Sequence, residues 1–161
     1  MTVSHDVFSE TNPAFCAYAL LGFVTAFVAV NEQGPEVPVA YLSLPVALSG
    51  DLGDSFGGTN KNTGLLEWLE RNPNVRVGLA ERVNGSMAIV TEAIRFGCFL
   101  SVLLVDERAR MRLGPRKVGK NVGKSMSDGP AQVLKRAERL GTWFACAGST
   151  KSVFDMMGFT V

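Results

Sequence analysis

The sequence predicts a single, mainly helical domain with one β-hairpin, and three observations support this fold class. The length of 161 residues is typical of one globular domain. Apolar residues recur every three or four positions over much of the chain, which is the spacing of a buried helix face. Near residue 99 the pattern changes to a bulky, β-prone run followed by alternating arginines. By analogy with this order of elements, the domain resembles a winged helix-turn-helix.

The first predicted helix spans residues 13–33. Asn12 has the side chain of an N-cap, and Pro13 suits the first helical position because its missing N–H has no helical partner there. A Gly-Pro pair ends the helix. The uncharged run 14–30, 17 residues long, is barely long enough to span a bilayer and has no flanking Lys or Arg. We therefore expect a buried core helix and no membrane contact.

A second apolar run covers residues 39–48, but its length is too short for periodicity to assign a type. Pro38 is expected to keep the chain extended, and Pro45 can begin a helix or kink one. We predict a helix over 45–56 and leave the residues before Pro45 open between helix and strand. Residues 51–64 are polar and rich in glycine, which predicts a loop over at least part of this stretch.

Two further helical segments precede the hairpin. Thr63 is a candidate N-cap for a helix over residues 65–71. Residues 75–96 carry apolar side chains at intervals of three or four, which again predicts helix. The Asn84-Gly85 pair favours a break of this segment into two short helices joined by a tight turn.

The predicted hairpin spans residues 99–113 and turns at Asp106-Glu107. Alternation along its second strand places apolar side chains on one face and three arginines on the other, namely Arg108, Arg110 and Arg112. Residues 114–129 follow, with glycines and lysines, and are predicted to form an exposed basic loop.

Two helices are predicted at the C-terminal end. Residues 131–147 space their apolar side chains for burial, and a short last helix is capped by Ser149 or Thr150. Gly158 is its expected C′ residue. At the other end of the domain, residues 1–11 are predicted to be a flexible tail.

Charge is segregated along the chain. Residues 1–106 have a balance of −6, whereas residues 107–139 have a balance of +7. Three interpretations of the basic segment remain open: contact with nucleic-acid phosphates in the manner of a wing, docking to an acidic protein surface, or a merely solvated face. The candidate contact residues are Arg108, Arg110, Arg112, Arg116, Lys117, Lys120 and Lys124.

The residue types needed for catalytic and metal sites are scarce. His5 is the single histidine, so a zinc site or a His-based triad lacks its parts. Cys16, Cys98 and Cys146 lie far apart in apolar surroundings and are expected to be small buried hydrophobes in a reducing compartment, the cytoplasm. Residues 119–125 end in Gly-Lys-Ser, but their glycines are too close together for a phosphate-binding loop. The sequence predicts no catalytic residue, cofactor or metal.

The composition favours assembly. Charged residues make up 19% of the chain, below the roughly 25% usual in soluble domains. The mean hydropathy is +0.17. Since contiguous apolar surface tends to mark a partner interface, we expect the chain to bind another component or a second copy of itself.

Three stretches carry a family resemblance. They are Asn12-Pro13-Ala14 at the start of the apolar helix, residues 40–48, and the C-terminal residues 135–159 with Phe154-Asp155-Met156-Met157-Gly158-Phe159 at their end. In this order they resemble the middle component of bacterial three-component ABC systems, over nearly the whole chain. One departure is the glycine-rich loop at residues 57–60, which is similar to an insertion.

The resemblance implies a bacterial protein that works with an ABC-type ATPase and a third, effector-bearing component against phage or other invading DNA. It brings no catalytic residues to this chain. We therefore predict a non-catalytic adaptor that links the ATPase and the effector by protein–protein contacts in antiviral defence. The alternative is a nucleic-acid-binding winged-helix module that uses the basic hairpin and loop. An enzyme would need converging titratable groups, which the sequence does not offer.

Overall fold

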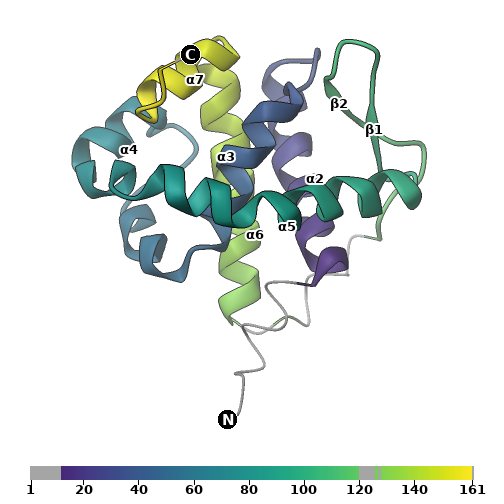
Figure 1. Cartoon of the computed structure of the whole chain (residues 1–161), viewed down its shortest axis with the longest axis horizontal. Helices are drawn as coiled ribbons and strands as arrows, with labels where there is room; N and C mark the ends of the chain where they lie inside the picture. Colours follow the sequence, from purple (N-terminus) through teal and green to yellow (C-terminus); the bar gives the residue numbers. More distant parts are fainter. Residues whose placement is uncertain (1–11, 120–125, 127, 161) are drawn as a thin grey trace.

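A computed structural model describes residues 12–119, 126 and 128–160. It confirms a mainly helical chain with a two-stranded antiparallel hairpin (Figure 1). Helix α5 crosses the molecule, so that α4 and the hairpin lie at opposite ends (Figure 1). In chain order, the elements are α2 (Pro13–Val30), α3 (Val37–Leu48), the 3₁₀ helix η1 (Gly50–Phe56), α4 (Leu65–Arg71), the 3₁₀ helix η2 (Pro73–Arg76), α5 (Leu79–Phe99), β1 (Leu103–Val105), β2 (Met111–Leu113), α6 (Asp128–Cys146) and α7 (Thr150–Met156).

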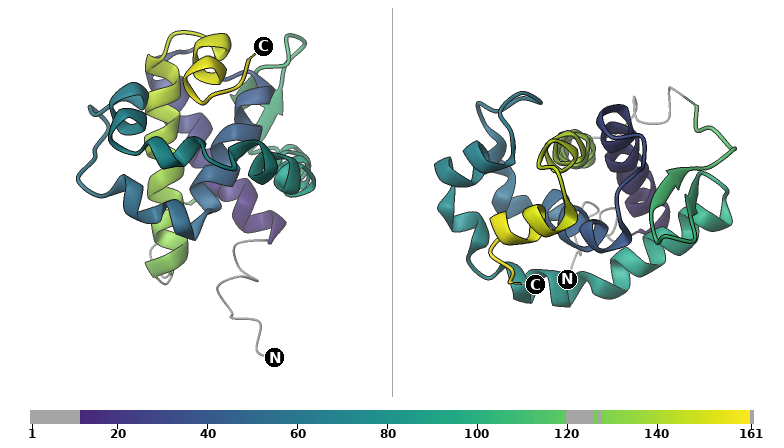
Figure 2. Two further views of the ribbon diagram at one scale, coloured as in Figure 1. Left: turned by 60° about the vertical axis from the view of Figure 1, so that its left-hand side comes forward. Right: turned by 90° about the horizontal axis from the view of Figure 1, so that it is seen from above.

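Helices α2 and α6 lie side by side at the centre of the fold (Figure 2). Asn12 caps α2 as predicted, because its Oδ1 accepts a hydrogen bond of 2.8 Å from the backbone N of Ala14. Gly141 on α6 allows the close approach of the two helices, since a Cβ at this position would clash with the backbone oxygen of Phe23. Helix α2 ends at Val30, three residues before the predicted end at residue 33.

Within the described residues, α2 is the one helix that is long and apolar enough to cross a membrane. In this structure 39% of it is buried, and Leu20, Phe23 and Val24 are almost completely enclosed. Its buried side packs against α6 and α5. The helix therefore forms part of the core, as its sequence predicts.

An aromatic cluster fills the core between η1, α4 and α6. The rings of Phe56 and Trp143 stack with centroids 5.9 Å apart, and Trp68 lies 4.9 Å from Phe56 and 5.4 Å from Trp143. Both indole N–H groups have partners: Trp68 donates to the backbone oxygen of Ser55 (3.1 Å) and Trp143 to that of Asn60 (3.0 Å). The cluster thus ties η1 and the following loop to α4 and α6.

The hairpin is shorter than predicted. Strands β1 and β2 pair antiparallel with Leu104 opposite Arg112, and the turn follows Asp106 as expected. The first strand cannot begin at Phe99, because that residue still belongs to α5. The second strand begins only at Met111, so Arg112 is the one predicted arginine within it.

The segment between α2 and α3 lies along the outer edge of β2. The backbone N of Met111 donates to the oxygen of Pro35 (2.7 Å), and the N of Val37 donates to that of Ala109 (2.8 Å). Gly34 has a φ of +79°, and a Cβ there would clash with the backbone oxygen of Met111. Glycine is therefore required for the chain to pass this close to the hairpin.

The predicted break at Asn84-Gly85 is wrong, because α5 continues through both residues. A glycine within a helix costs only about 1 kcal/mol relative to alanine. Burial of Leu79, Val90 and Ala93 along one face outweighs that cost, so the helix continues.

The predictions around α3 and α4 also need correction. Pro38 lies in the first turn of α3 instead of in extended chain, a position where proline costs no hydrogen bond. Pro45 lies inside the same helix, and the region predicted as one helix over 45–56 divides into the end of α3 and η1. The N-cap of α4 is Gly64, not Thr63.

The C-terminal helices agree with the sequence pattern. Helix α6 buries Val133, Leu140 and Phe144, and the Ser149 side chain caps α7 by accepting from the backbone N of Ser152 (3.0 Å). Gly158 follows α7 with a φ of +90°, as expected for a C′ glycine.

Candidate functional site

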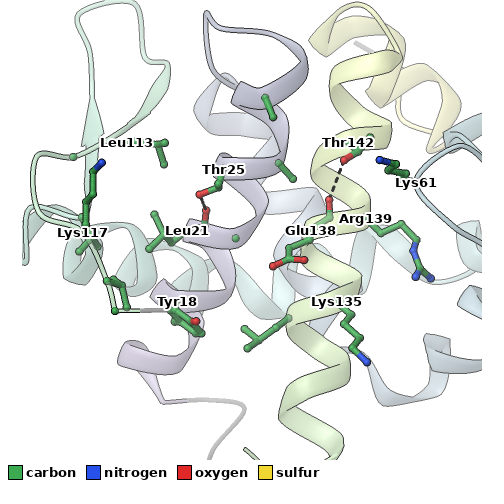
Figure 3. Close-up of a pocket in the computed structure, with 18 of the residues that line it drawn as sticks. Tyr18, Leu21, Thr25, Lys61, Leu113, Lys117, Lys135, Glu138, Arg139 and Thr142 are labelled. Atoms are coloured by element: carbon green, nitrogen blue, oxygen red, sulfur yellow. Dashed lines mark hydrogen bonds between the residues drawn. The ribbon is translucent and has the colours of Figure 1, made fainter. Parts of the chain in front are cut away.

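A groove with a volume of about 790 Å³ runs along the seam between α2 and α6 (Figure 3). The two helices form its floor. Residues 113–119, from the last residue of β2 onward, form one wall, and Lys61 borders the groove on the side of α6 (Figure 3). With Val102, which precedes β1, the groove thus collects residues from five separate parts of the chain.

The floor of the groove is mainly apolar. It includes Tyr18, Leu21 and Ala26 from α2 and Leu134 from α6, with Leu113 beside them. Two threonines also line it, but each hydroxyl donates to its own helix, as in the 2.7 Å hydrogen bond from the Oγ1 of Thr25 to the backbone oxygen of Leu21. The floor therefore offers apolar contact and few unpaired donors.

The rim of the groove is basic. Among the described residues that line it, five cations surround a single carboxylate, that of Glu138. Arg139 is held in place because its Nη1 donates to the Oγ1 of Thr59 (3.0 Å) and to the backbone oxygen of Phe56 (3.4 Å). A rim of this sign favours an anionic ligand. The five cations, called the basic rim below, are Lys61, Arg116, Lys117, Lys135 and Arg139.

The structure brings two of the predicted contact residues, Arg116 and Lys117, into this basic rim. Sequence reasoning missed the other three members. Lys135 and Arg139 are four residues apart on α6, a spacing that places both on one helix face and could have identified them. Lys61 lies at the groove because the loop between η1 and α4 brings it there, and no local sequence pattern predicts the course of that loop.

Arg110 makes contacts within the chain. Its Nη1 donates to the backbone oxygen of Gly34 (2.8 Å), and its Nη2 lies 3.2 Å from the Oε1 of Glu36. Only 24% of its side chain is exposed. Arg110 therefore fastens the hairpin to the segment that follows α2.

The Asp106 carboxylate accepts hydrogen bonds from the hairpin turn and from Arg112. Its Oδ1 accepts from the backbone N of Arg108 (2.9 Å) and of Arg110 (3.0 Å), and its Oδ2 accepts from the Nε of Arg112 (3.0 Å). The Arg110 N–H and the Arg112 guanidinium hold the pKa of the Asp106 carboxyl below its ordinary value. The Arg108 residue itself is exposed, so its guanidinium is the freest of the three hairpin arginines to meet another molecule.

The predicted basic loop lies only partly within the described chain. Pro115, Arg116 and Lys117 are exposed, as expected. Lys120 and Lys124 lie outside the described residues, as does most of the Gly-Lys-Ser stretch.

Elsewhere in the described ranges, no three His, Cys, Asp or Glu side chains gather where they could hold a metal ion. Asp51 is paired with Arg82 (2.8 Å), whose hydrogen bond lowers the pKa of the Asp51 carboxyl. Partial burial raises the pKa of the Cys98 thiol and so disfavours its reactive thiolate. The expected burial of the cysteines is confirmed for Cys16 only, because Cys98 is half-buried and Cys146 is exposed at the end of α6.

These features define a helical domain with an open groove that is apolar along its floor and basic along its rim. The model of the family called ABC-three component (ABC-3C) system Middle Component 3 matches residues 2–161, and the chain belongs to this family. The resemblance noted in the sequence is thereby confirmed. No curated protein and no solved structure matches the chain.

Proposed function

We propose that this middle component is a non-catalytic adaptor that links an ABC-type ATPase to a third, effector component in bacterial defence against invading DNA. In this proposal the protein is soluble and cytoplasmic and needs no cofactor. Family membership supports its association with other ABC-3C components. The adaptor role is an inference from the form of the site.

The groove between α2 and α6 is the observation that carries this proposal. It is about 790 Å³ in volume and combines apolar contact with an excess of cations, which suits the capture of another chain. Catalysis would need a nucleophile, acid or base with a converging partner. The titratable side chains that line the groove are cations, one carboxylate and the phenol of Tyr18, an arrangement better suited to binding than to bond cleavage.

Co-expression with the products of the adjacent genes tests the adaptor role. We expect the chain to copurify with the ATPase and with the third component, and the ATPase to lose the third component when this chain is omitted. The purified chain alone should neither hydrolyse ATP nor cleave nucleic acid. An ATPase and effector that assemble equally well without the chain would contradict the proposal.

Nucleic-acid binding is the alternative function, and the exposed cations of the hairpin and the basic rim favour it. One observation weighs against it. In a winged helix-turn-helix the helix before the hairpin would read the duplex, yet α5 carries two acidic and two basic residues and has no positive excess. The winged-helix arrangement itself stays a prediction.

Fluorescence anisotropy with a labelled 20-bp duplex over a range of salt concentrations separates the two functions. An adaptor should bind weakly and should show little salt dependence, whereas a phosphate-binding module loses affinity steeply as salt rises. Substituting glutamate for both Arg116 and Lys117 should leave this weak binding almost unchanged. A salt-sensitive duplex affinity that the double variant abolishes would favour the nucleic-acid function.

The idea that the hairpin arginines form a partner contact stays a prediction, and a single substitution tests it better than the replacement of all three. Replacing all three by glutamate would place a carboxylate at position 110 beside Glu36 and would remove the bond to Gly34, so the fold itself would suffer. Arg108→Glu alone is the suitable variant, because Arg108 is exposed in the turn. Its thermal stability should be nearly unchanged.

A further inference from the structure

We propose that the groove between α2 and α6 binds an acidic amphipathic helix contributed by another component of the assembly. The inference depends on the proposed adaptor function and specifies which surface the adaptor uses and what it recognises. It rests on three features of the groove: the apolar floor, the basic rim and the lack of available backbone partners.

The apolar floor calls for apolar side chains on the ligand. Tyr18 and Leu21 on α2 and Leu134 on α6 lie along the seam, and each is partly accessible. Figure 3 shows that Tyr18, Leu21 and Thr25 follow one another along the groove face of α2. A ligand that covers this strip removes apolar surface from water, which favours binding.

The basic rim calls for acidic residues beside those apolar ones. Lys117 stands on the wall formed after β2, while Lys135 and Arg139 stand on α6 across the groove (Figure 3). A ligand with carboxylates on both flanks of its apolar face would meet cations on both sides. A lysine-rich ligand would meet like charges on both sides, and a neutral one would leave them unmatched.

The backbone of the groove favours a helical ligand. The amides and carbonyls of α2 and α6 are used within those helices, so an added strand would find few partners on the floor. A helix satisfies its own backbone and can lie in the trough between two others. Duplex nucleic acid fits the observations less well, because phosphates gain nothing from an apolar floor.

Site-specific photo-crosslinking in the co-expressed ABC-3C assembly tests the proposal. A benzophenone amino acid is placed at position 25, on the groove face of α2, and at position 88 as the control, an exposed site on α5. We expect position 25 to form an adduct with another component. Mass spectrometry should locate that adduct in a segment with apolar residues at helical spacing flanked by Asp or Glu.

Two pairs of variants measure the contribution of floor and rim. Ala29→Trp fills the groove, and Ala88→Trp adds the same bulk at the exposed site on α5. The Lys117→Glu/Lys135→Glu double variant reverses the rim, and Lys151→Glu reverses an exposed charge on α7. We expect each groove variant to weaken assembly by at least about tenfold and the controls to change it little.

The outcomes distinguish a failure of the groove proposal from a failure of the proposed adaptor function. If the assembly forms but position 25 crosslinks no other component, the groove proposal fails and the adaptor role stands. An adduct with residues 1–11, with a second copy of this chain, with DNA, or with a segment lacking acidic flanks also overturns the proposal. If no assembly forms with the wild-type chain, the proposed function fails as well. Should Ala29→Trp not fold, the crosslinking result decides.

Discussion

At the α4 end of the molecule, three aromatic rings pack against one another, and both indole N–H groups donate to backbone oxygens. At the hairpin end, three chain segments are joined by backbone hydrogen bonds and by arginines that reach carboxylates and carbonyls. The two ends lie on opposite sides of the α2–α6 pair (Figure 2). Packing of buried rings stabilises the α4 end, whereas backbone hydrogen bonds and arginine contacts join the segments at the hairpin end.

This difference predicts that the two ends respond to different perturbations. Loss of buried volume should affect the aromatic end most, because cores are closely packed and collapse only partly around a cavity. Changes of charge, salt or pH should affect the hairpin end, since exposed ion pairs are weak and screened.

The largest effect is expected for Trp143→Ala. The side chain is completely buried and contacts both Phe56 and Trp68, so its removal should lower the free energy of unfolding by about 3–5 kcal/mol. Urea titration followed by far-UV circular dichroism measures this. A loss below about 1 kcal/mol would mean that the cluster is not the main contribution to this end.

Gly141→Ala should destabilise the central pair by about 1–3 kcal/mol, because the new Cβ would press α6 away from Phe23. Gly85→Ala is the matched control: it makes the same change within α5, where no atom lies within 4 Å of the added Cβ. The control should stabilise the protein by about 1 kcal/mol. Equal signs for the two variants in calorimetry would contradict the close approach of α2 and α6.

Arg110→Met should cost about 1 kcal/mol, since it keeps the aliphatic stem but removes the bonds to Gly34 and Glu36. Arg95→Met serves for comparison, because Arg95 forms an exposed pair with Glu92 and should contribute at most about 0.5 kcal/mol. Both variants are compared by urea titration. If Arg95→Met lowers the free energy of unfolding as much as Arg110→Met does, the attachment of the hairpin by Arg110 is disproved.

The smallest effect concerns pH. Because the folded-state pKa of Asp106 is lowered, its carboxylate stabilises the fold above its unfolded-state pKa, and this contribution is lost as pH falls below about 4. Asp106→Asn should therefore have a lower Tm than the wild type at pH 7, and the difference should shrink at acidic pH. Asp51 titrates in both proteins, so the difference isolates Asp106. A difference that does not vary with pH would contradict this role.

Much of the aromatic end could be predicted from the sequence, and less of the hairpin end. The spacing of apolar residues identified α4 and α6 because burial is periodic along a helix. Likewise, Asn12 and Ser149 identified helix starts because a cap is a local interaction. The attachment of Arg110 to Gly34 joins residues 76 positions apart, and no local pattern indicates such a contact.

Only two residues of the groove were among the predicted contact residues, because the others come together through contacts between distant parts of the chain. Arg116 and Lys117 belong to the basic segment that charge counting identified. The apolar floor was assigned to the core, because a side chain on the rim of a helix stripe has the same spacing as one in its centre. Lys61 joins the site through tertiary structure alone.

The proximity of Trp68 and Trp143 also determines which structural changes intrinsic tryptophan fluorescence can detect. They are the only two tryptophans in the chain, both are fully enclosed, and their rings are 5.4 Å apart. Intrinsic fluorescence should thus have a blue-shifted emission from a single site and should shift to the red when η1, α4 and α6 separate. Detachment of the hairpin would leave that emission unchanged. A tryptophan introduced at exposed Leu104 would give the hairpin its own signal.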